Sequence, residues 1–320
     1  VFMNEFEILD VINNRLSSSE FLGDDCAFLE DWNIFVTHDT LVEDVHFTMH
    51  TTSPYLLGRK SVAVNLSDLA AALCEAKYIT VSLSMPSDIK KSFVEEFYEG
   101  INDICNEYGV KVAGGDLTSS EKIVVSICAV GKKISLYRTS RKFAKNGDCI
   151  VITGMHGSSS AGLYALSEFL YAGESLINSH LNPVPALKES RILSSVIDSN
   201  IAAMDTSDGL IDALYKISSA SNHSMEIDIN KVPFHPELSL FCSYNKLDAK
   251  QFIKWGGEDY QLIACVPKNV YEKLDKELFT CIGKVLNKST NPCVFVKDGE
   301  NTEKITKDIV CRKTFSHFNN

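Results

Sequence analysis

The sequence predicts a protein of the mixed α/β class (α/β or α+β). Short runs rich in β-branched and aromatic residues alternate with segments of helical periodicity along the whole chain. A length of 320 residues is enough for about two domains. A composition of 45% hydrophobic and 23% charged residues is typical of soluble globular chains and excludes disordered, collagen-like and coiled-coil classes.

The first elements follow from local patterns. Strands are predicted over residues 33–37, 78–83, 123–131 and 149–153. A first helix begins after Ser53, because serine caps helices and Pro54 suits the first helical position. Its residues are apolar nearly all round, so we expect it to be buried. A second helix, over about 92–108, has apolar residues every three or four positions and is expected to pack on a sheet.

A basic, apolar-poor stretch over residues 132–146 predicts a domain boundary, giving domains 1–146 and 147–320. Beyond it the chain continues with a Gly/Ser loop over 154–160, a helix over 161–170, a loop around 182–185, and further strands and helices. The Gly/Ser loop is interpreted as a tight turn, with an anion contact as the alternative. No internal repeat is visible.

The charge balance limits the partners. Lys and Arg number 31 against 42 Asp and Glu, a net charge of −11. Such a chain repels phosphate backbones and anionic bilayers, so broad nucleic-acid or membrane-surface binding is not expected. The excess of carboxylates can serve surface solubility, or some of the carboxylates can bind metal ions.

The ten cysteines have no zinc or iron–sulfur spacing, since the closest pair is twelve positions apart. Most lie in apolar runs, where a free thiol fills core space. We also see no basic-then-apolar leader and no run of about 18 to 20 apolar residues. These features predict a reduced, cytoplasmic protein.

Five acidic segments are the most informative feature. Four of them adjoin predicted strands or helix starts, and one lies inside the buried helix. They are Gly23-Asp24-Asp25, Thr37-His38-Asp39-Thr40, Asn65-Leu66-Ser67-Asp68, Gly114-Gly115-Asp116 and Asp205-Thr206-Ser207-Asp208-Gly209. Taken singly, each is explained by a helix cap or a turn.

Asp68 is harder to explain structurally, because an unpaired carboxylate in an apolar helix is costly unless it is paired or binds a cation. Asn65 shares its helix face. Carboxylates and hydroxyls without a His/Cys cluster form a hard oxygen set, which suits Mg²⁺. Several Mg²⁺ ions would bring phosphates to an acidic protein, so the pattern favours a nucleotide triphosphate as ligand.

The common nucleotide fingerprints are missing. The segment beginning at Gly154 lacks the Gly-Lys-Ser/Thr of a P-loop and the Gly-x-Gly-x-x-Gly of a dinucleotide fold, and no protein-kinase set is present. The sequence also has no Gly-x-Ser-x-Gly elbow, so a serine hydrolase is not predicted. An ATP site, if present, therefore has another architecture.

The five segments, in this order, resemble the thiamine-monophosphate kinase family of the aminoimidazole-ribonucleotide-synthetase-like ATP-binding superfamily. The resemblance extends from Glu5-Phe6 to Phe318. The motifs that carry it are Asp39-Thr40-Leu41, Ala63-Val64-Asn65-Leu66-Ser67-Asp68-Leu69-Ala70, Ser207-Asp208-Gly209-Leu210 and Trp255-Gly256-Gly257-Glu258-Asp259-Tyr260. Each is weak alone, but the ordered set is specific.

The resemblance implies Mg-dependent transfer of the ATP γ-phosphoryl group to thiamine monophosphate, giving thiamine diphosphate and ADP. It also implies a two-domain synthetase-like architecture. An N-terminal ATP- and Mg-binding domain of sheet and helices would pair in a homodimer barrel, with each ATP site near the interface. A C-terminal α/β sandwich would form the substrate side.

By motif, the resemblance also implies site residues. The magnesium set is Asp25, Thr37, Asp39, Asp68, Asp116, Asp205 and Asp208, of which Asp39, Asp68 and Asp208 are taken as catalytic. The nucleotide contacts are Gly115, Asp116, Arg141, Ser207 and Tyr98, and the substrate contacts are His46, Glu258 and Phe315. Arg141 is preferred to Arg138 because it stands seven residues before Asp148, as in the family.

Plain structural roles stay open for three of these residues: Arg141 as a linker arginine, His46 as a packed histidine and Phe315 as a docked tail. The chain also departs from the family, with His38 in place of Ser or Thr and Phe315 in place of Tyr or Trp. The alternative functions are another ATP-dependent enzyme of the superfamily, such as an aminoimidazole ribonucleotide synthetase-like or selenophosphate-synthetase-like protein, and a non-catalytic nucleotide-binding protein.

Overall fold

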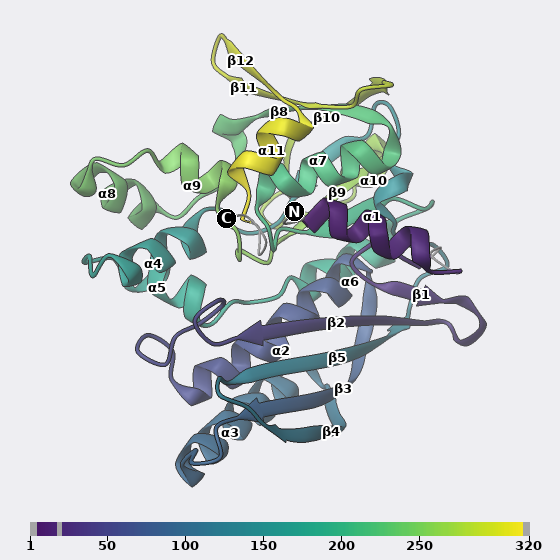
Figure 1. Ribbon diagram of the computed structural model, residues 1–320. Coiled ribbons are helices and arrows are strands. Elements are labelled where there is room, and N and C mark those ends of the chain that lie inside the picture. The colour runs from purple at the N-terminus through teal and green to yellow at the C-terminus, as the bar shows by residue number, and fades with distance from the viewer. Residues whose placement is uncertain (1–4, 18–20, 316–320) are drawn as a thin grey trace.

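The computed structural model describes residues 5–17 and 21–315, with no account of the side chains of Glu5 and Phe6. Two sheets organise it, one of five strands and one of seven (Figure 1). Helices accompany both sheets, so the mixed α/β class is confirmed. No helix among the described residues is long and apolar enough to cross a bilayer.

The five-stranded sheet comes from the first part of the chain. Its strand order is β1-β2-β5-β3-β4, with β3 and β4 parallel and the other neighbours antiparallel. The strands are β1 (Ala27–Leu29), β2 (Ile34–Val42), β3 (Cys74–Met85), β4 (Lys111–Ser119) and β5 (Val124–Lys133). Helix α2 (Pro54–Ala71) packs against β2, β5 and β3, and α3 (Lys91–Tyr108) packs on α2. These helices cover one face of the sheet (Figure 1).

Both predicted helices of this half are confirmed. Ser53 caps α2 by accepting a hydrogen bond from the Leu56 amide at 3.3 Å, and Pro54 stands at its first position. Most of α2 is buried, as its all-round apolar pattern predicts. The expectation that it is the first helix is wrong, because α1 (Glu5–Arg15) precedes it. Leu9 and Ile12 of α1 are exposed, so these two residues do not form the buried stripe that would indicate a helix packed on a core.

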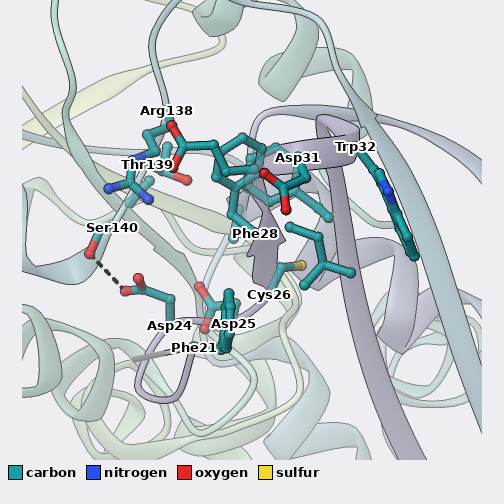
Figure 2. Close-up of a pocket in the computed structure, with 16 residues that line it drawn as sticks. Phe21, Asp24, Asp25, Cys26, Phe28, Asp31, Trp32, Arg138, Thr139 and Ser140 are labelled. Atoms are coloured by element: carbon teal, nitrogen blue, oxygen red, sulfur yellow. Dashed lines mark hydrogen bonds between the residues drawn. The ribbon is translucent and has the colours of Figure 1, made fainter. Parts of the chain in front are cut away.

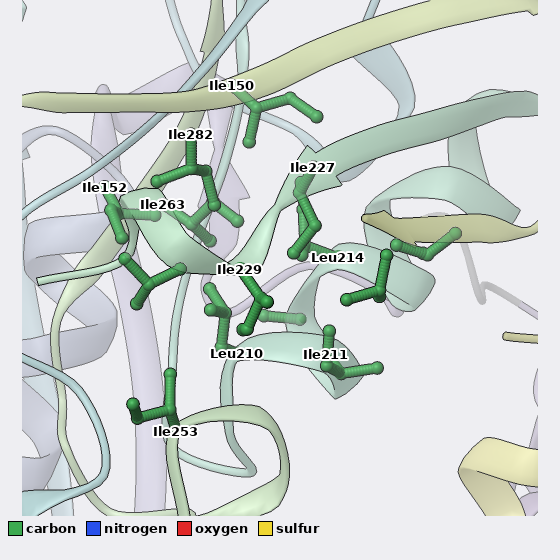
Figure 3. Packing of buried hydrophobic residues seen from close by; sticks show 14 of the residues in the cluster. Ile150, Ile152, Leu210, Ile211, Leu214, Ile227, Ile229, Ile253, Ile263 and Ile282 are labelled. Carbon is green, nitrogen blue, oxygen red and sulfur yellow. The ribbon is translucent and has the colours of Figure 1, made fainter. Parts of the chain in front are cut away.

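The seven-stranded sheet has the order β12-β11-β8-β10-β6-β9-β7. Its strands are β6 (Cys149–Ile152), β7 (Ala202–Asp205), β8 (His223–Asp228), β9 (Leu262–Val266), β10 (Thr280–Lys288), β11 (Val294–Asp298) and β12 (Asn301–Ile305). The helices are α4 (Ser158–Ser167), α5 (Glu174–Leu181), α6 (Leu187–Val196), α7 (Leu210–Ser221), α8 (Pro236–Asn245), α9 (Ala249–Trp255), α10 (Lys268–Tyr271) and α11 (Lys307–Lys313). Isoleucines and leucines of the sheet and of α7 form its core (Figure 3).

For two of the acidic segments, the plain explanation as a helix cap or a turn is wrong. The segment from Thr37 to Thr40 lies within β2, and Gly114 to Asp116 lies within β4. Both strands continue through polar residues because their hydrogen-bond partners on β5 and β3 continue. Backbone pairing thus outweighs the turn preference of glycine and aspartate.

The segment between Lys133 and Cys149 connects the two sheets and contains the short turn Arg141–Phe143. The predicted domain boundary falls here and stays a prediction. Ala71 and Leu73, at the end of α2 and before β3, pack in one cluster with Val151 and Leu262 of the seven-stranded sheet, so the two halves share buried apolar contacts. All ten cysteines are free thiols, six of them buried.

Candidate active site

Acidic residues from five parts of the chain gather where α2 meets the seven-stranded sheet. Asp25 precedes β1, Asp39 lies on β2, Asp68 on α2, Asp205 at the end of β7 and Asp208 before α7. Carboxylate oxygens of Asp25, Asp68 and Asp205 lie within 4.8 Å of one another. We call these five residues the carboxylate cluster. The magnesium residues predicted from four separate segments are therefore neighbours.

Hydroxyl and amide groups hold the cluster in place. The Thr37 hydroxyl donates to Asp68. Asp205 accepts from the Ser67 hydroxyl at 2.6 Å and from the Ser207 hydroxyl at 2.8 Å. The Asn65 side-chain oxygen accepts the backbone N–H of Asp39 at 3.2 Å, which ties β2 to α2.

The period of two in β2 explains the orientation of His38. Thr37 faces the cluster, whereas the His38 ring bonds to Ser126 at 2.8 Å on the other face of the sheet. The His38 side chain therefore does not replace a ligand of the cluster. Its departure from the family pattern changes the opposite face of the sheet and leaves the cluster side chains unaltered.

Ionisation of the aspartates in the cluster is unfavourable when no cation is bound. Burial, followed by repulsion from neighbouring aspartates, raises the pKa of Asp39 to about 7. Burial raises the pKa of Asp25 to about 6, against the attraction of Arg141. Burial and neighbouring carboxylates also raise the pKa of Asp68. The fold thus holds several carboxylates in a place that favours their protonated forms.

Two basic side chains border the cluster. Arg141, largely buried, pairs with Asp25. Lys216 of α7 pairs with Asp208 at 2.6 Å and with Asp212 at 2.7 Å. Neither cation pairs with Asp68 or Asp205, so the repulsion between these two carboxylates is not relieved. Carboxylate and hydroxyl oxygens without His or Cys suit Mg²⁺, and a divalent cation would relieve this repulsion.

Asp116 is not part of this group. Across the sheet, Asp39 aligns with Ile127, Ile127 with Val81, and Val81 with Gly115. Three strand spacings amount to about 14 Å. Asp116 is exposed on the edge strand β4, so within one chain it is too distant to share an ion with Asp39.

The glycine before it has a packing role. A side chain at Gly115 would meet the Val81 carbonyl oxygen at 1.8 Å, close to a register shift between β3 and β4. The close approach of strand backbones explains this glycine without a phosphate. Tyr98 also lies away from the cluster, on α3, where its ring makes an edge contact with Phe97 at 5.4 Å.

A cavity of about 510 Å³ adjoins one side of the cluster. Asp24 and Asp25 line it together with the aromatic rings of Phe21, Phe28 and Trp32 (Figure 2). Asp24 accepts the Ser140 hydroxyl at 3.1 Å and the Arg141 amide at 2.8 Å, which ties this wall to the connecting segment. Arg138, not chosen from the sequence, lies 5.8 Å from the Phe28 ring centre in the same wall.

A larger cavity of about 1180 Å³ adjoins the other side, where the remaining cluster residues line it. The three predicted substrate contacts His46, Glu258 and Phe315 line this same cavity. The His46 ring accepts the Val42 amide at 3.0 Å, so it also stabilises the turn after β2. The cluster therefore lies between two cavities.

Glu258 is held by two residues that the sequence interpretation missed. Lys60 of α2 donates to its Oε2 at 3.1 Å, and His180 of α5 lies 3.0 Å from the same oxygen. Burial alone would raise the pKa of Glu258, but Lys60 and His180 outweigh it and lower the pKa to about 2. A lysine inside a helix expected to be buried was the visible signal for Lys60. His180 had none.

The predicted Gly/Ser loop over 154–160 is shorter than expected, because Ser158 to Ser160 already belong to α4 and only residues 154–157 form a loop. Gly154 and Gly157 have φ of +57° and +86°. The anion at the following helix start comes from the chain itself, because Asp259 accepts the Gly157 amide at 2.6 Å and the Ser159 amide at 3.1 Å.

Comparisons with known proteins agree with this arrangement. Residues 23–132 match the family model described as AIR synthase related protein, N-terminal domain. Thiamine-monophosphate kinase of Bacillus subtilis is 33% identical over 99% of this chain and 100% of its own length. The Escherichia coli K12 enzyme is 34% identical over 98% of both chains. A structure described as AaThiL complexed with AMPPCP and TMP superposes with a TM-score of 0.85 at 32% identity, covering 98% of this chain and 97% of the other.

Proposed function

The chain belongs to the thiamine-monophosphate kinase family, and we propose that it transfers the γ-phosphoryl group of ATP to the phosphate of thiamine monophosphate. The products are thiamine diphosphate and ADP. The observation that carries the proposal is the carboxylate cluster between two cavities, because two phosphate-bearing substrates can then meet at one place.

We propose that Asp25, Asp39, Asp68, Asp205 and Asp208, with Thr37, hold Mg²⁺. The raised pKa values of Asp25 and Asp39 support this, since a cation would stabilise both carboxylates in their ionised forms. Bound Mg²⁺ neutralises phosphate oxygens during phosphoryl transfer. The acceptor phosphate is already anionic at neutral pH, so no general base is needed and the chain's own task is positioning.

The cavities suggest where each substrate lies. The larger one has the predicted substrate contacts His46, Glu258 and Phe315, so we assign it to thiamine monophosphate. The smaller one is lined by aromatic rings beside Asp25, and Arg141 and Ser207 adjoin the cluster, so we assign this side to ATP. The two phosphate groups would then meet between Asp25 and Asp205.

A homodimer would complete the nucleotide side. In the single chain β1 and β4 are the two edges of the five-stranded sheet, and Leu117 on β4 is 65% exposed. If β4 of one copy extends the β1 edge of another, a closed barrel forms and both edges are paired. Gly115, Asp116 and Tyr98 would then reach the ATP site from the partner, which explains why one chain leaves them apart.

The location is proposed as cytoplasmic, because the ten free thiols suit a reducing compartment. The competing enzyme classes of the superfamily share the acidic cluster but differ in the acceptor. The acceptor therefore decides between them.

The test is an assay of purified protein with ATP, Mg²⁺ and thiamine monophosphate, with products separated chromatographically. We expect thiamine diphosphate and ADP in equal amounts, and no turnover with EDTA. ATP binding without any thiamine diphosphate above a no-enzyme control would overturn the kinase assignment. ATP hydrolysis stimulated by another acceptor would support the ligase alternative.

A further inference from the structure

A lysine side chain is enclosed in the helix that also carries Asp68. Lys60 is 1% exposed and is among the largest fully buried side chains of the described residues. A buried ammonium group is costly without a partner, and its partner here is Glu258 at 3.1 Å. The pair joins α2 to the segment between α9 and β9. Lys60 and Glu258 are 198 positions apart in sequence.

The pairing uses one oxygen of the carboxylate. Lys60 Nζ and His180 Nδ1 both contact Oε2 of Glu258. Among the residues that the structure describes, Oε1 has no hydrogen-bond partner. The Glu258 side chain is 23% exposed and lines the larger cavity, so Oε1 is the oxygen available to a ligand there.

The backbone of Glu258 is fixed as well. Its φ of +63° is unusual for a residue other than glycine, and its amide donates to the Ser207 carbonyl at 2.6 Å. Side-chain and main-chain contacts together leave the carboxylate little freedom. A fixed acceptor oxygen in a cavity recognises an N–H donor at a defined position.

The same helix sets the distance to the carboxylate cluster. Lys60, Val64 and Asp68 follow one another at intervals of four and share a face of α2. Eight residues of helix span about 12 Å. One rigid element thus links the carboxylate that faces the organic end of a ligand to the carboxylate that faces its phosphate.

From this arrangement we infer that Lys60 and His180 are positioning residues, which hold Glu258 so that its free oxygen accepts an N–H group from the heterocyclic end of the phosphate ester. The inference rests on the proposed function. Because Lys60 neutralises Glu258, recognition comes from hydrogen bonding more than from net charge, and an aminopyrimidine ring offers the required N–H donors.

The test compares Lys60→Met with the wild type and with Lys254→Met. Lys254 is a matched control, because it pairs with Glu303 at 3.0 Å and lines neither cavity. We expect Lys60→Met to raise KM for thiamine monophosphate about tenfold or more, with KM for ATP within about twofold of wild type. Lys254→Met should change neither. Equal rises in both KM values would overturn the inference.

A double variant covers the case in which Lys60→Met does not fold. Lys60→Met/Glu258→Gln leaves no unpaired buried charge, so we expect it to fold better than the single variant, as thermal melting would show. It should still have a raised KM for thiamine monophosphate, because the oxygen is no longer held. A folded double variant with wild-type KM would also overturn the inference. Inactive wild-type protein would instead refute the proposed function.

Discussion

The two ends of helix α2 show opposite ways of burying carboxylates. Around Asp68 several aspartates face one another, and burial with mutual repulsion raises the pKa of Asp39 to about 7. Around Lys60, Glu258 has a cation and a histidine, and its pKa is lowered to about 2 despite burial. The second arrangement is complete within the chain. Among the described residues, Asp68 and Asp205 lack a compensating cation. This difference identifies the surroundings of Asp68 as the place where ions and phosphates would bind.

The largest effect is expected from removing an aspartate of the carboxylate cluster. Asp39→Ala and Asp208→Ala should each lower kcat by about a hundredfold or more, because a lost metal ligand leaves phosphate charge unneutralised. Steady-state assays measure this, with thermal melting to show a cooperative fold. Asp198→Ala, exposed and outside both cavities, is the control. Near-normal turnover in either cluster variant would remove that residue from the metal set.

A second experiment asks whether Asp116 joins the cluster from another copy. Asp39→Ala and Asp116→Ala proteins should each be inactive. In a mixed dimer, one of the two sites would have both Asp39 of one copy and Asp116 of the partner subunit intact. About half of the dimers in an equal mixture are mixed after subunit exchange, so about a quarter of wild-type activity should return. Size-exclusion chromatography tests whether the protein is a dimer. No recovery despite subunit exchange would argue against a shared site.

In the larger cavity, Phe315→Ala should raise KM for thiamine monophosphate about fivefold, since one aromatic contact contributes about 1 kcal/mol. KM for ATP should stay constant. Tyr244→Ala is a suitable control, because Tyr244 is an aromatic residue 86% exposed outside both cavities. An unchanged KM would leave Phe315 as a docked tail.

The smallest effect is on stability without metal. Burial raises the pKa of Asp25 to about 6 and of Asp39 to about 7, so the folded protein retains protons that the unfolded chain releases. Stability should therefore fall as pH rises from about 5 to 8, lowering Tm by a few degrees. Glu258, with a pKa near 2, adds no change in this range.

Added Mg²⁺ should restore Tm at pH 8 more than at pH 5, because protons compete with the ion for the carboxylates. Calorimetry with EDTA and with Mg²⁺ measures both trends. A metal-free Tm that is constant or rises with pH would contradict the carboxylate arrangement.

Local signals predicted much of the fold. The cap at Ser53 and the apolar periodicity placed α2 and α3 to within a residue or so. They failed where local preference and tertiary pairing disagree. The polar stretches around Asp39 and Asp116 suggested turns, yet both lie within strands whose neighbours supply the hydrogen bonds. Helix α1 was missed because it shows no clear apolar stripe, and Leu9, Val11 and Ile12 are exposed.

The candidate site shows the same division. Residue types and motif order were sufficient to select the aspartates and their chemistry, because an acidic residue in an apolar helix already demands a partner. Only the tertiary structure decided which of them meet: Asp25, Asp68 and Asp205 converge, whereas Asp116 lies about 14 Å from Asp39 along the sheet. Likewise the ion pair of Lys60 with Glu258 joins residues 198 positions apart. Sequence determines which side chains require partners, and the three-dimensional fold determines which partners are within reach.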